Sequence, residues 1–136
     1  MTDGLVLIDT SVWILALRRR ADEKTKGLVS RILDQDRAAT CGLISVELLG
    51  GARTRKEYEA LSKDLEALHY LPTPEPTWRK VSLLCLRLRA KGISIPYTDL
   101  LIAQIAMDNG CTLLHSDSHF NLIARHTNLH AQNAPK

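Results

Sequence analysis

Short apolar segments alternate along the chain with longer segments whose apolar residues recur at helical spacing. Residues 5–8 (LVLI) form a continuous apolar run, which is typical of a parallel strand covered on both faces. Helical spacing of leucine, isoleucine and valine marks residues 22–36, 57–68 and 77–91. The alternation of the two patterns predicts an α/β fold with a mostly parallel sheet.

Shorter apolar runs and turn residues complete this outline. Further strands are predicted over 38–41, 69–71, 112–114 and 128–130, and further helices over 12–16, 44–49, 98–108 and 120–124. Thr10 and Ser11 are expected to cap the helix over 12–16. We expect a three-layer α/β/α sandwich with a four- or five-stranded, mostly parallel sheet and residues 5–8 near its centre. The domain is expected to span 1–131, followed by a frayed tail over 132–136.

Four acidic residues occupy equivalent places in this pattern. Asp9 ends the first apolar run, and Asp117 follows the strand predicted over 112–114. Glu47 and Asp99 are expected in the first turns of the helices that follow other strands. Ligands of open α/β sheets bind outside the carboxyl ends of the strands, where these helices begin. Carboxylates that converge there repel one another unless a cation lies between them, so the sequence predicts a divalent metal site.

Clustered carboxylates of this kind suit the hydrolysis of phosphodiester bonds. Two divalent ions about 3.5–4 Å apart can activate a water molecule and neutralise the phosphate. Asp9 and Asp99 are the principal ligand candidates, and Glu47 and Asp117 would complete the set directly or through water. The expected cofactor is Mg²⁺ or Mn²⁺. Candidates for orienting these carboxylates are Thr10, Thr98 and Ser116.

The net charge becomes informative once these acids are set aside. The whole chain carries 18 Lys and Arg against 15 Asp and Glu, a net charge of +3. Without the four clustered acids, 18 basic and 11 acidic residues remain, a balance of +7. A basic body around an acidic pocket suits a polyanionic substrate. Solvated surface charge accounts for most of the basic residues, and the candidates for phosphate contacts are Arg18, Arg19, Arg20, Arg53, Arg55 and Lys56.

Cysteine usage and the apolar runs bear on the compartment. Cys41, Cys85 and Cys111 are odd in number and widely spaced, so we expect reduced core thiols and neither a disulfide framework nor a zinc site. The longest apolar stretches reach four to six residues, far short of a membrane span. The first residues lead into a strand without a basic and apolar leader, so we expect no signal peptide and a cytoplasmic location.

Four segments resemble the acidic motifs of PIN-domain nucleases. Residues 7–13 (LIDTSVW) resemble the opening strand and turn of that family, and residues 44–51 (ISVELLGG) resemble its second motif. Residues 96–103 (PYTDLLIA) and 113–120 (LLHSDSHF) resemble the third and fourth motifs, with Ser116 where many relatives have Thr or Asn. The order and spacing of the motifs, which cover about residues 5–129, are most similar to the VapC-type toxins of bacterial toxin–antitoxin modules.

This resemblance implies a divalent-metal-dependent ribonuclease that acts as a toxin. Asp9, Glu47, Asp99 and Asp117 match the catalytic acids of the family. The resemblance also implies a homodimer and a cognate antitoxin that blocks the cleft. His119 resembles a recurring position in the toxins, and the sequence leaves open whether it acts in catalysis or packs near Phe120. It also leaves open whether transfer, ribosomal or messenger RNA is cut.

Two other classes of protein with a similar first strand require residues that this chain lacks. A phosphatase of the haloacid dehalogenase type requires an Asp two residues after the first Asp, where this chain has Ser11. A response-regulator receiver requires an acidic pair near its first strand and a late lysine, and no lysine lies between Gly92 and Pro135. The remaining alternative is a PIN-like RNA-processing nuclease, or an RNA-binding scaffold, without a toxin role.

Overall fold

The alternation of strands and helices extends through the part of the chain that the structure describes. The computed structural model describes residues 4–18 and 22–135, so Arg19 and Arg20 of the basic run lie outside the described residues. The strands are β1 (Val6–Ile8), β2 (Ala38–Cys41), β3 (His69–Leu71), β4 (Thr112–His115) and β5 (His130–Asn133). The helices are α1 (Thr10–Leu17), α2 (Glu23–Asp34), α3 (Gly42–Leu49), α4 (Arg55–Glu66), α5 (Glu75–Ala90), α6 (Tyr97–Asp108) and α7 (Ser118–Ala124). Among these, no helix has the length and the apolar character that crossing a bilayer requires.

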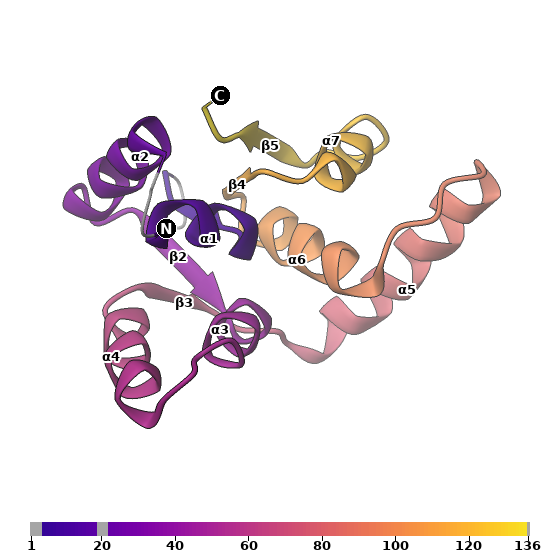
Figure 1. Ribbon diagram of the computed structural model, residues 1–136. Helices are drawn as coiled ribbons and strands as arrows, with labels where there is room; N and C mark the ends of the chain where they lie inside the picture. The colour runs from indigo at the N-terminus through magenta and orange to yellow at the C-terminus, as the bar shows by residue number, and fades with distance from the viewer. Residues whose placement is uncertain (1–3, 19–21, 136) are drawn as a thin grey trace.

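All five strands are parallel and form one sheet with the order β3-β2-β1-β4-β5. β1 is the central strand, and all three of its residues are buried. A strand covered on both faces needs apolar side chains on both, which explains its continuous apolar run. Figure 1 shows α2 and α4 to the left of the sheet and α5, α6 and α7 to its right. The three-layer sandwich predicted from the sequence is confirmed.

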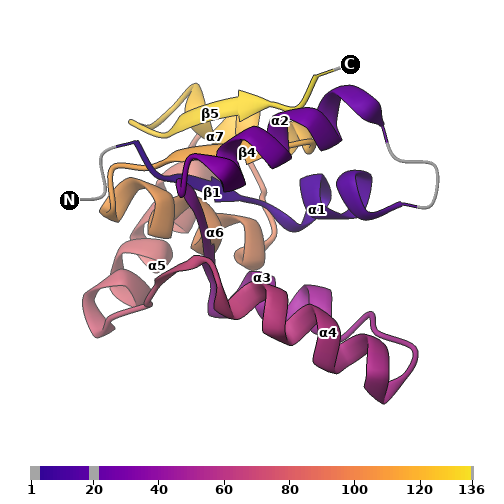
Figure 2. The ribbon, with the colours of Figure 1, turned by 90° about the vertical axis from the view of Figure 1, so that its left-hand side faces the viewer.

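The strand order creates a topological switch point beside β1. From β1 the chain moves outward through β2 to β3, and α5 and α6 then return it to β4 on the other side of β1. At such a point, the helices that follow the two central strands diverge and leave a crevice at the carboxyl edge of the sheet. Figure 2 shows α1 leaving the sheet at this edge. The residues that follow β1 and β4 are therefore brought to the same crevice.

The C-terminal segment differs from the prediction. We expected a strand over 128–130 and fraying from Gln132, but β5 runs from His130 to Asn133 and pairs with β4. The backbone N–H of Ala134 donates to the carbonyl oxygen of His115 (2.7 Å), and the Ala134 side chain is buried. Asn133 also exchanges two amide hydrogen bonds with Asn121 of α7 (3.0 and 3.3 Å). An edge strand of mostly polar residues carries no apolar signal, so its pairing comes from the neighbouring strand.

The three cysteines lie in the apolar interior, as the sequence predicts. Cys41, Cys85 and Cys111 are buried and free. Burial raises the pKa of the Cys41 and Cys111 thiols, because the charged thiolate is poorly solvated there. Both thiols are therefore neutral parts of the core.

A hydrogen-bonded carboxylate joins α5 to α6. Asp108 accepts hydrogen bonds from the Thr77 hydroxyl (2.7 Å), from Lys80 Nζ (3.1 Å) and from Gln104 Nε2 (2.9 Å). Burial raises the pKa of Asp108, but these hydrogen bonds and the charge of Lys80 outweigh burial and lower it overall. The ionised carboxylate therefore stabilises the contact between the two helices.

We expect Asp108→Ala to lower the free energy of unfolding by about 1–3 kcal/mol, because hydrogen bonds to a charged acceptor are lost. A carboxylate with a depressed pKa stabilises the fold fully above its unfolded pKa, and this stabilisation is lost as pH falls through the folded pKa. The difference between the two proteins should therefore shrink in acid. Denaturant titration at several pH values measures it. The control is Asp34→Ala, since Asp34 ends α2 as Asp108 ends α6 but its side chain accepts no hydrogen bond from the described residues. Equal losses in both variants would contradict a specific role for Asp108.

Candidate active site

Asp9 is the most buried of the four acidic residues, at 5% exposed. It follows β1 directly and is the N-cap of α1, where its carboxylate accepts the backbone N–H of Ser11 (3.0 Å). We expected Thr10 and Ser11 to cap this helix, but the helix already begins at Thr10, so the capping position falls on Asp9. The N-terminus of a helix favours a negative charge, so this capping position suits a carboxylate.

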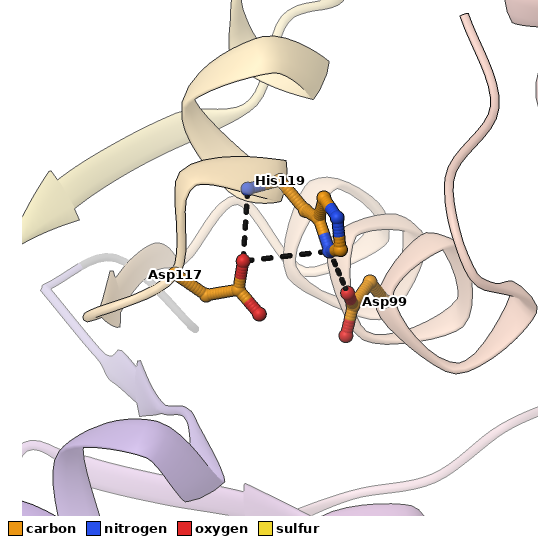
Figure 3. Close-up of side chains that lie close together, drawn as sticks. All are labelled: Asp99, Asp117 and His119. Atoms are coloured by element: carbon orange, nitrogen blue, oxygen red, sulfur yellow. Dashed lines mark hydrogen bonds and ion pairs between the residues drawn. The ribbon is translucent and has the colours of Figure 1, made fainter.

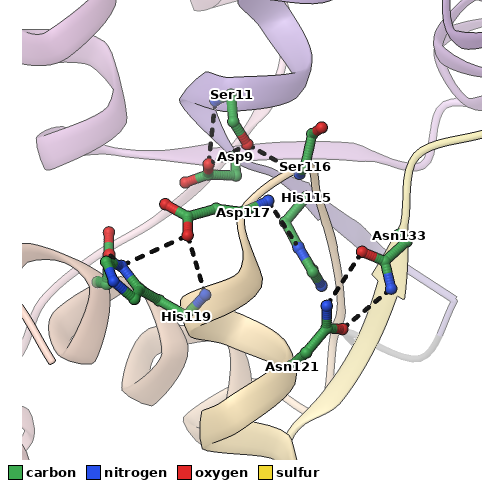
Figure 4. A network of polar contacts seen from close by, with 9 residues as sticks. Asp9, Ser11, His115, Ser116, Asp117, His119, Asn121 and Asn133 are labelled. Carbon is green, nitrogen blue, oxygen red and sulfur yellow. Dashed lines mark hydrogen bonds and ion pairs between the residues drawn. The ribbon is translucent and has the colours of Figure 1, made fainter. Parts of the chain in front are cut away.

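Ser11 connects Asp9 to the end of β4. Its hydroxyl donates to Oδ2 of Asp9 (2.6 Å) and accepts the backbone N–H of Ser116 (2.9 Å). Figure 4 shows this chain of contacts between residues that lie far apart in the sequence. Ser11 therefore fixes the orientation of the Asp9 carboxylate and the position of the loop that carries Asp117. Its spacing two residues after Asp9 is typical of a capping turn and could have identified this role.

Glu47 reaches the site from α3 and is exposed. Its Oε1 accepts a hydrogen bond from the hydroxyl of Thr10 (3.0 Å), which orients this carboxylate. We expected Glu47 in the first turn of its helix, but α3 starts at Gly42 and Glu47 lies in the second turn. Glu47 is therefore one turn away from the N-terminus of α3, whereas Asp99 lies in the first turn of α6.

Asp99 and Asp117 meet at the imidazole of His119. Nδ1 of His119 lies 2.8 Å from Oδ2 of Asp99 and 3.4 Å from Oδ1 of Asp117. Asp117 is the N-cap of α7 and accepts the backbone N–H of His119 (2.9 Å), which sets where the ring lies. Figure 3 shows the two carboxylates on either side of this nitrogen. One ligand atom from each of the three residues lies within 4.8 Å of the other two.

The sequence left the place of His119 open between the site and a contact with Phe120. In the structure the histidine beside Phe120 is His115, with ring centroids 5.2 Å apart. His115 is buried at the end of β4, and its Nδ1 accepts the backbone N–H of Asp117 (3.2 Å). Burial lowers the pKa of His115, so this ring is neutral and supports the loop from beneath. No local sequence pattern distinguishes the roles of these two histidines.

The carboxylates influence one another's ionisation. Burial raises the pKa of Asp99, and the charges of Asp117 and Asp9 raise it further, against the hydrogen bond and charge of His119. Partial desolvation of its carboxylate also raises the pKa of Glu47, and the charges of Asp9 and Asp99 add to this effect, against the hydrogen bond from Thr10. The four acids, which come from four separate segments of the chain, therefore lie close enough for their charges to affect one another.

This set of donors suits a divalent cation. The oxygens of carboxylates are the ligands that Mg²⁺ and Mn²⁺ prefer. Among the described residues, the one basic side chain in an ion pair with these acids is His119. Four carboxylates and a single imidazole leave a negative excess, which adds to the larger effect of burial in raising the pKa values of Asp99 and Glu47. Among the described residues, Asp99, Asp117 and His119 lie close enough together to share one cation, whereas Asp9 and Glu47 act on the same site through their charge.

Two of the predicted orienting residues behave differently from expectation. The side chain of Thr98 is exposed and makes no hydrogen bond to these carboxylates within the described part of the chain. Ser116 contributes its backbone N–H to Ser11, while its own side chain is exposed. Among Thr10, Thr98 and Ser116, Thr10 makes a side-chain hydrogen bond to one of the acids in the described part of the chain.

A groove leads away from the acids along α1, α3 and α4. A hollow of about 500 Å³ begins at Thr10 and Glu47 and is also lined by Ile14, Arg18, Arg53 and Glu57. A second hollow of about 580 Å³, lined by Trp13, Leu33 and Leu65 among others, shares Leu17, Leu48 and Leu61 with the first. Because they share three leucines, the two hollows adjoin and form one groove, with a charged end that includes Glu47 and a mostly apolar end that also includes Lys63 and Asp64. Arg55 lines a separate hollow near Arg53, and Lys56 is exposed.

Known proteins resemble this chain in sequence and fold. The family model of the PIN domain matches residues 6–126. The VapC ribonuclease Mb1587 of Mycobacterium bovis is 30% identical over 131 residues, which cover 93% of this chain and 97% of that protein. The crystal structure of VapBC2 from Rickettsia felis bound to a promoter DNA fragment has a TM-score of 0.80 at 20% identity, over 96% of this chain and 99% of that one. VapBC-5 of Mycobacterium tuberculosis, from the VapBC family of toxin–antitoxin systems, has a TM-score of 0.62 at 22% identity, over 98% and 99% of the two chains.

In protein freed of metal, we expect Asp99→Asn to raise the melting temperature by a few degrees. A carboxyl whose folded pKa is raised binds its proton more tightly in the folded state, so stability falls as pH rises from the unfolded to the folded pKa. The amide removes this penalty at neutral pH, and the gain should vanish in acid. Thermal unfolding in the presence of a chelator measures both. Asp64→Asn, at an exposed acid of α4, is the control, and a destabilised Asp99→Asn protein would refute the repulsion argument.

Proposed function

The chain belongs to the PIN-domain family and, within it, to the VapC ribonucleases, and we propose that it is the ribonuclease toxin of a toxin–antitoxin pair. Its reaction is the hydrolysis of RNA phosphodiester bonds. The observation that carries this proposal is the convergence of Asp9, Glu47, Asp99 and Asp117 at the carboxyl edge of the sheet. An acidic site on a basic body matches a metal-assisted reaction on a polyanion.

Asp9 and Asp99 are the proposed principal ligands of a divalent cation, Mg²⁺ or Mn²⁺, with Glu47 and Asp117 completing the set directly or through water. The donor chemistry of these carboxylates and their mutual repulsion support this assignment. When bound, such a cation supplies positive charge to the reacting phosphate and lowers the pKa of a water molecule.

The contribution of the protein itself is to hold these carboxylates in place before RNA arrives. Ser11 fixes Asp9 through two hydrogen bonds, and Thr10 fixes Glu47 through one. His119 lies between Asp99 and Asp117, with its Nδ1 2.8 Å and 3.4 Å from an oxygen of each. Side chains held in this way need little reorganisation during the reaction, which is a large part of electrostatic catalysis.

The charged end of the groove is the proposed path of the RNA strand. Arg18 and Arg53 line it next to Glu47, and Arg55 and Lys56 follow closely in the chain as the first residues of α4. Arginine binds phosphate through two parallel hydrogen bonds, so these residues can hold the RNA backbone beside the acids. Mapping of cleavage ends in cells after induced expression would identify which RNA is cut.

The apolar end of the groove is the proposed seat of an antitoxin. Leu17 and Leu33 are 58% and 41% exposed there, which leaves room for the apolar face of a partner helix. A tail that continues along the groove would bring an arginine to the acids, where a guanidinium can replace the cation through charge-assisted hydrogen bonds. Such a partner would exclude both the cation and RNA. Family resemblance also supports the proposal that the free protein is a homodimer.

The purified protein is expected to cleave RNA when Mg²⁺ or Mn²⁺ is present, and chelation should abolish cleavage. Asp9→Asn and Asp99→Asn should each lower the rate by at least about 100-fold, since each removes a proposed ligand. Hydrolysis should leave 5′-phosphate and 3′-hydroxyl ends, which end-labelling of the products detects. Glu75→Gln, at an exposed acid of α5 outside both hollows, should cleave like the wild type. Undiminished cleavage by Asp99→Asn would rule out this mechanism.

Co-expression with the adjacent small reading frame should restore growth and yield a complex. Leu33→Asp should weaken that complex by at least about tenfold, because the aspartate places a charge in the apolar end of the groove, away from the proposed RNA path. Leu83→Asp on α5 is the matched control, since Leu83 is 51% exposed and lies outside the groove. RNA cleavage by both variants should remain. If the adjacent product neither rescues growth nor co-purifies, the toxin assignment falls and an RNA-processing nuclease takes its place.

A further inference from the structure

His119 places a nitrogen among the oxygens of the acidic site. Its Nδ1 lies 2.8 Å from an oxygen of Asp99 and 3.4 Å from an oxygen of Asp117. The ring is held there because the backbone of His119 forms the capping hydrogen bond to Asp117 at the start of α7. Figure 3 shows the nitrogen directed into the space between the two carboxylates. A cation bound by both carboxylates would therefore meet this nitrogen as well.

The second ring nitrogen of His119, Nε2, is available to carry the proton of the ring. No hydrogen bond among the described residues holds Nε2 of His119, and the side chain is 41% exposed. A neutral imidazole can carry its proton on either nitrogen. With the proton on Nε2, Nδ1 presents a lone pair to a cation without any movement of the backbone.

Donor type decides which cation such a site prefers. Sites built from carboxylate and water oxygens accept Mg²⁺ readily, whereas imidazole nitrogen binds first-row transition metals far better than Mg²⁺. Mn²⁺ accepts mixed sets, because it also suits oxygen ligands. We propose that His119 is a ligand of the cation at Asp99 and Asp117, and that its nitrogen makes this site favour divalent transition-metal ions over Mg²⁺. The inference rests on the proposed function only in taking this site to be a cation site.

A simpler role for His119 is that of a hydrogen-bond donor to Asp99. His119→Asn separates the two roles, because an asparagine amide can donate from nearly the position of Nδ1 but offers no imidazole nitrogen. His126→Asn is the matched control, since His126 is an exposed histidine just beyond α7. Thermal unfolding of both variants establishes that they are folded before metal is added.

The experiment measures Mn²⁺ and Mg²⁺ binding to the full chain by calorimetry, without RNA. The wild type and His126→Asn should bind Mn²⁺ more tightly than Mg²⁺. In His119→Asn, the affinity for Mn²⁺ should fall by about 10–100-fold and that for Mg²⁺ far less. Pulsed electron paramagnetic resonance of bound Mn²⁺ should detect coupling to a nitrogen nucleus in the wild type, and this coupling should be absent in His119→Asn.

Two results would overturn the proposal. One is Mn²⁺ bound to the wild type without nitrogen coupling. The other is an unchanged ratio of Mn²⁺ to Mg²⁺ affinity in the folded His119→Asn protein, which would leave His119 as a hydrogen-bond donor alone. Either result would leave the ribonuclease proposal standing, because cleavage could still depend on the carboxylates. Absence of any cation binding by the wild type would refute the proposed metal dependence together with the role of His119.

Discussion

The parallel pairing of β1 with β4 is the contact on which the site depends. These strands are far apart in the sequence, yet Ile8 pairs with Leu114, and the backbone N–H of Asp9 donates to the carbonyl oxygen of Leu114 (2.9 Å). The pairing brings the ends of the two strands to one edge, where Ser11 joins the turn after β1 to the loop after β4. A shift of this register by one residue would turn the side chains to opposite faces and separate Asp9 from Asp117.

The carboxylates of the site lie close together, and the protein does not supply enough positive charge to neutralise them. Burial and mutual repulsion raise the pKa values of Asp99 and Glu47, whereas hydrogen bonds from His119 and Thr10 act against this effect. The apolar core and the central strands hold these acids together despite their repulsion. Local instability of this kind is typical of functional sites, because a bound ligand rather than the protein supplies the missing charge.

The groove beside Glu47 has two ends that suit different ligands. Its charged end offers Arg18 and Arg53 to a phosphate backbone, and its apolar end offers Leu17 and Leu33 to a helix. Under the proposed function, RNA and antitoxin therefore compete for the residues beside Glu47. Both ligands exploit the same excess of negative charge, RNA through a cation and the antitoxin through a guanidinium. Inhibition then requires no change of fold.

The sequence by itself determined the alternation of strands and helices, the central position of β1 and the places of the four acids near strand ends and in helices. These features depend on local periodicity and on residue type, which each segment carries independently of its partners. Tertiary structure decided the rest: the second-turn place of Glu47, the contact from Ser11 to Ser116, the pairing of β5, and which histidine meets the acids. Each of these depends on a partner distant in the chain. His115 and His119 flank the same aspartate, but only the packing of β4 and α7 sends one ring into the core and the other to the carboxylates.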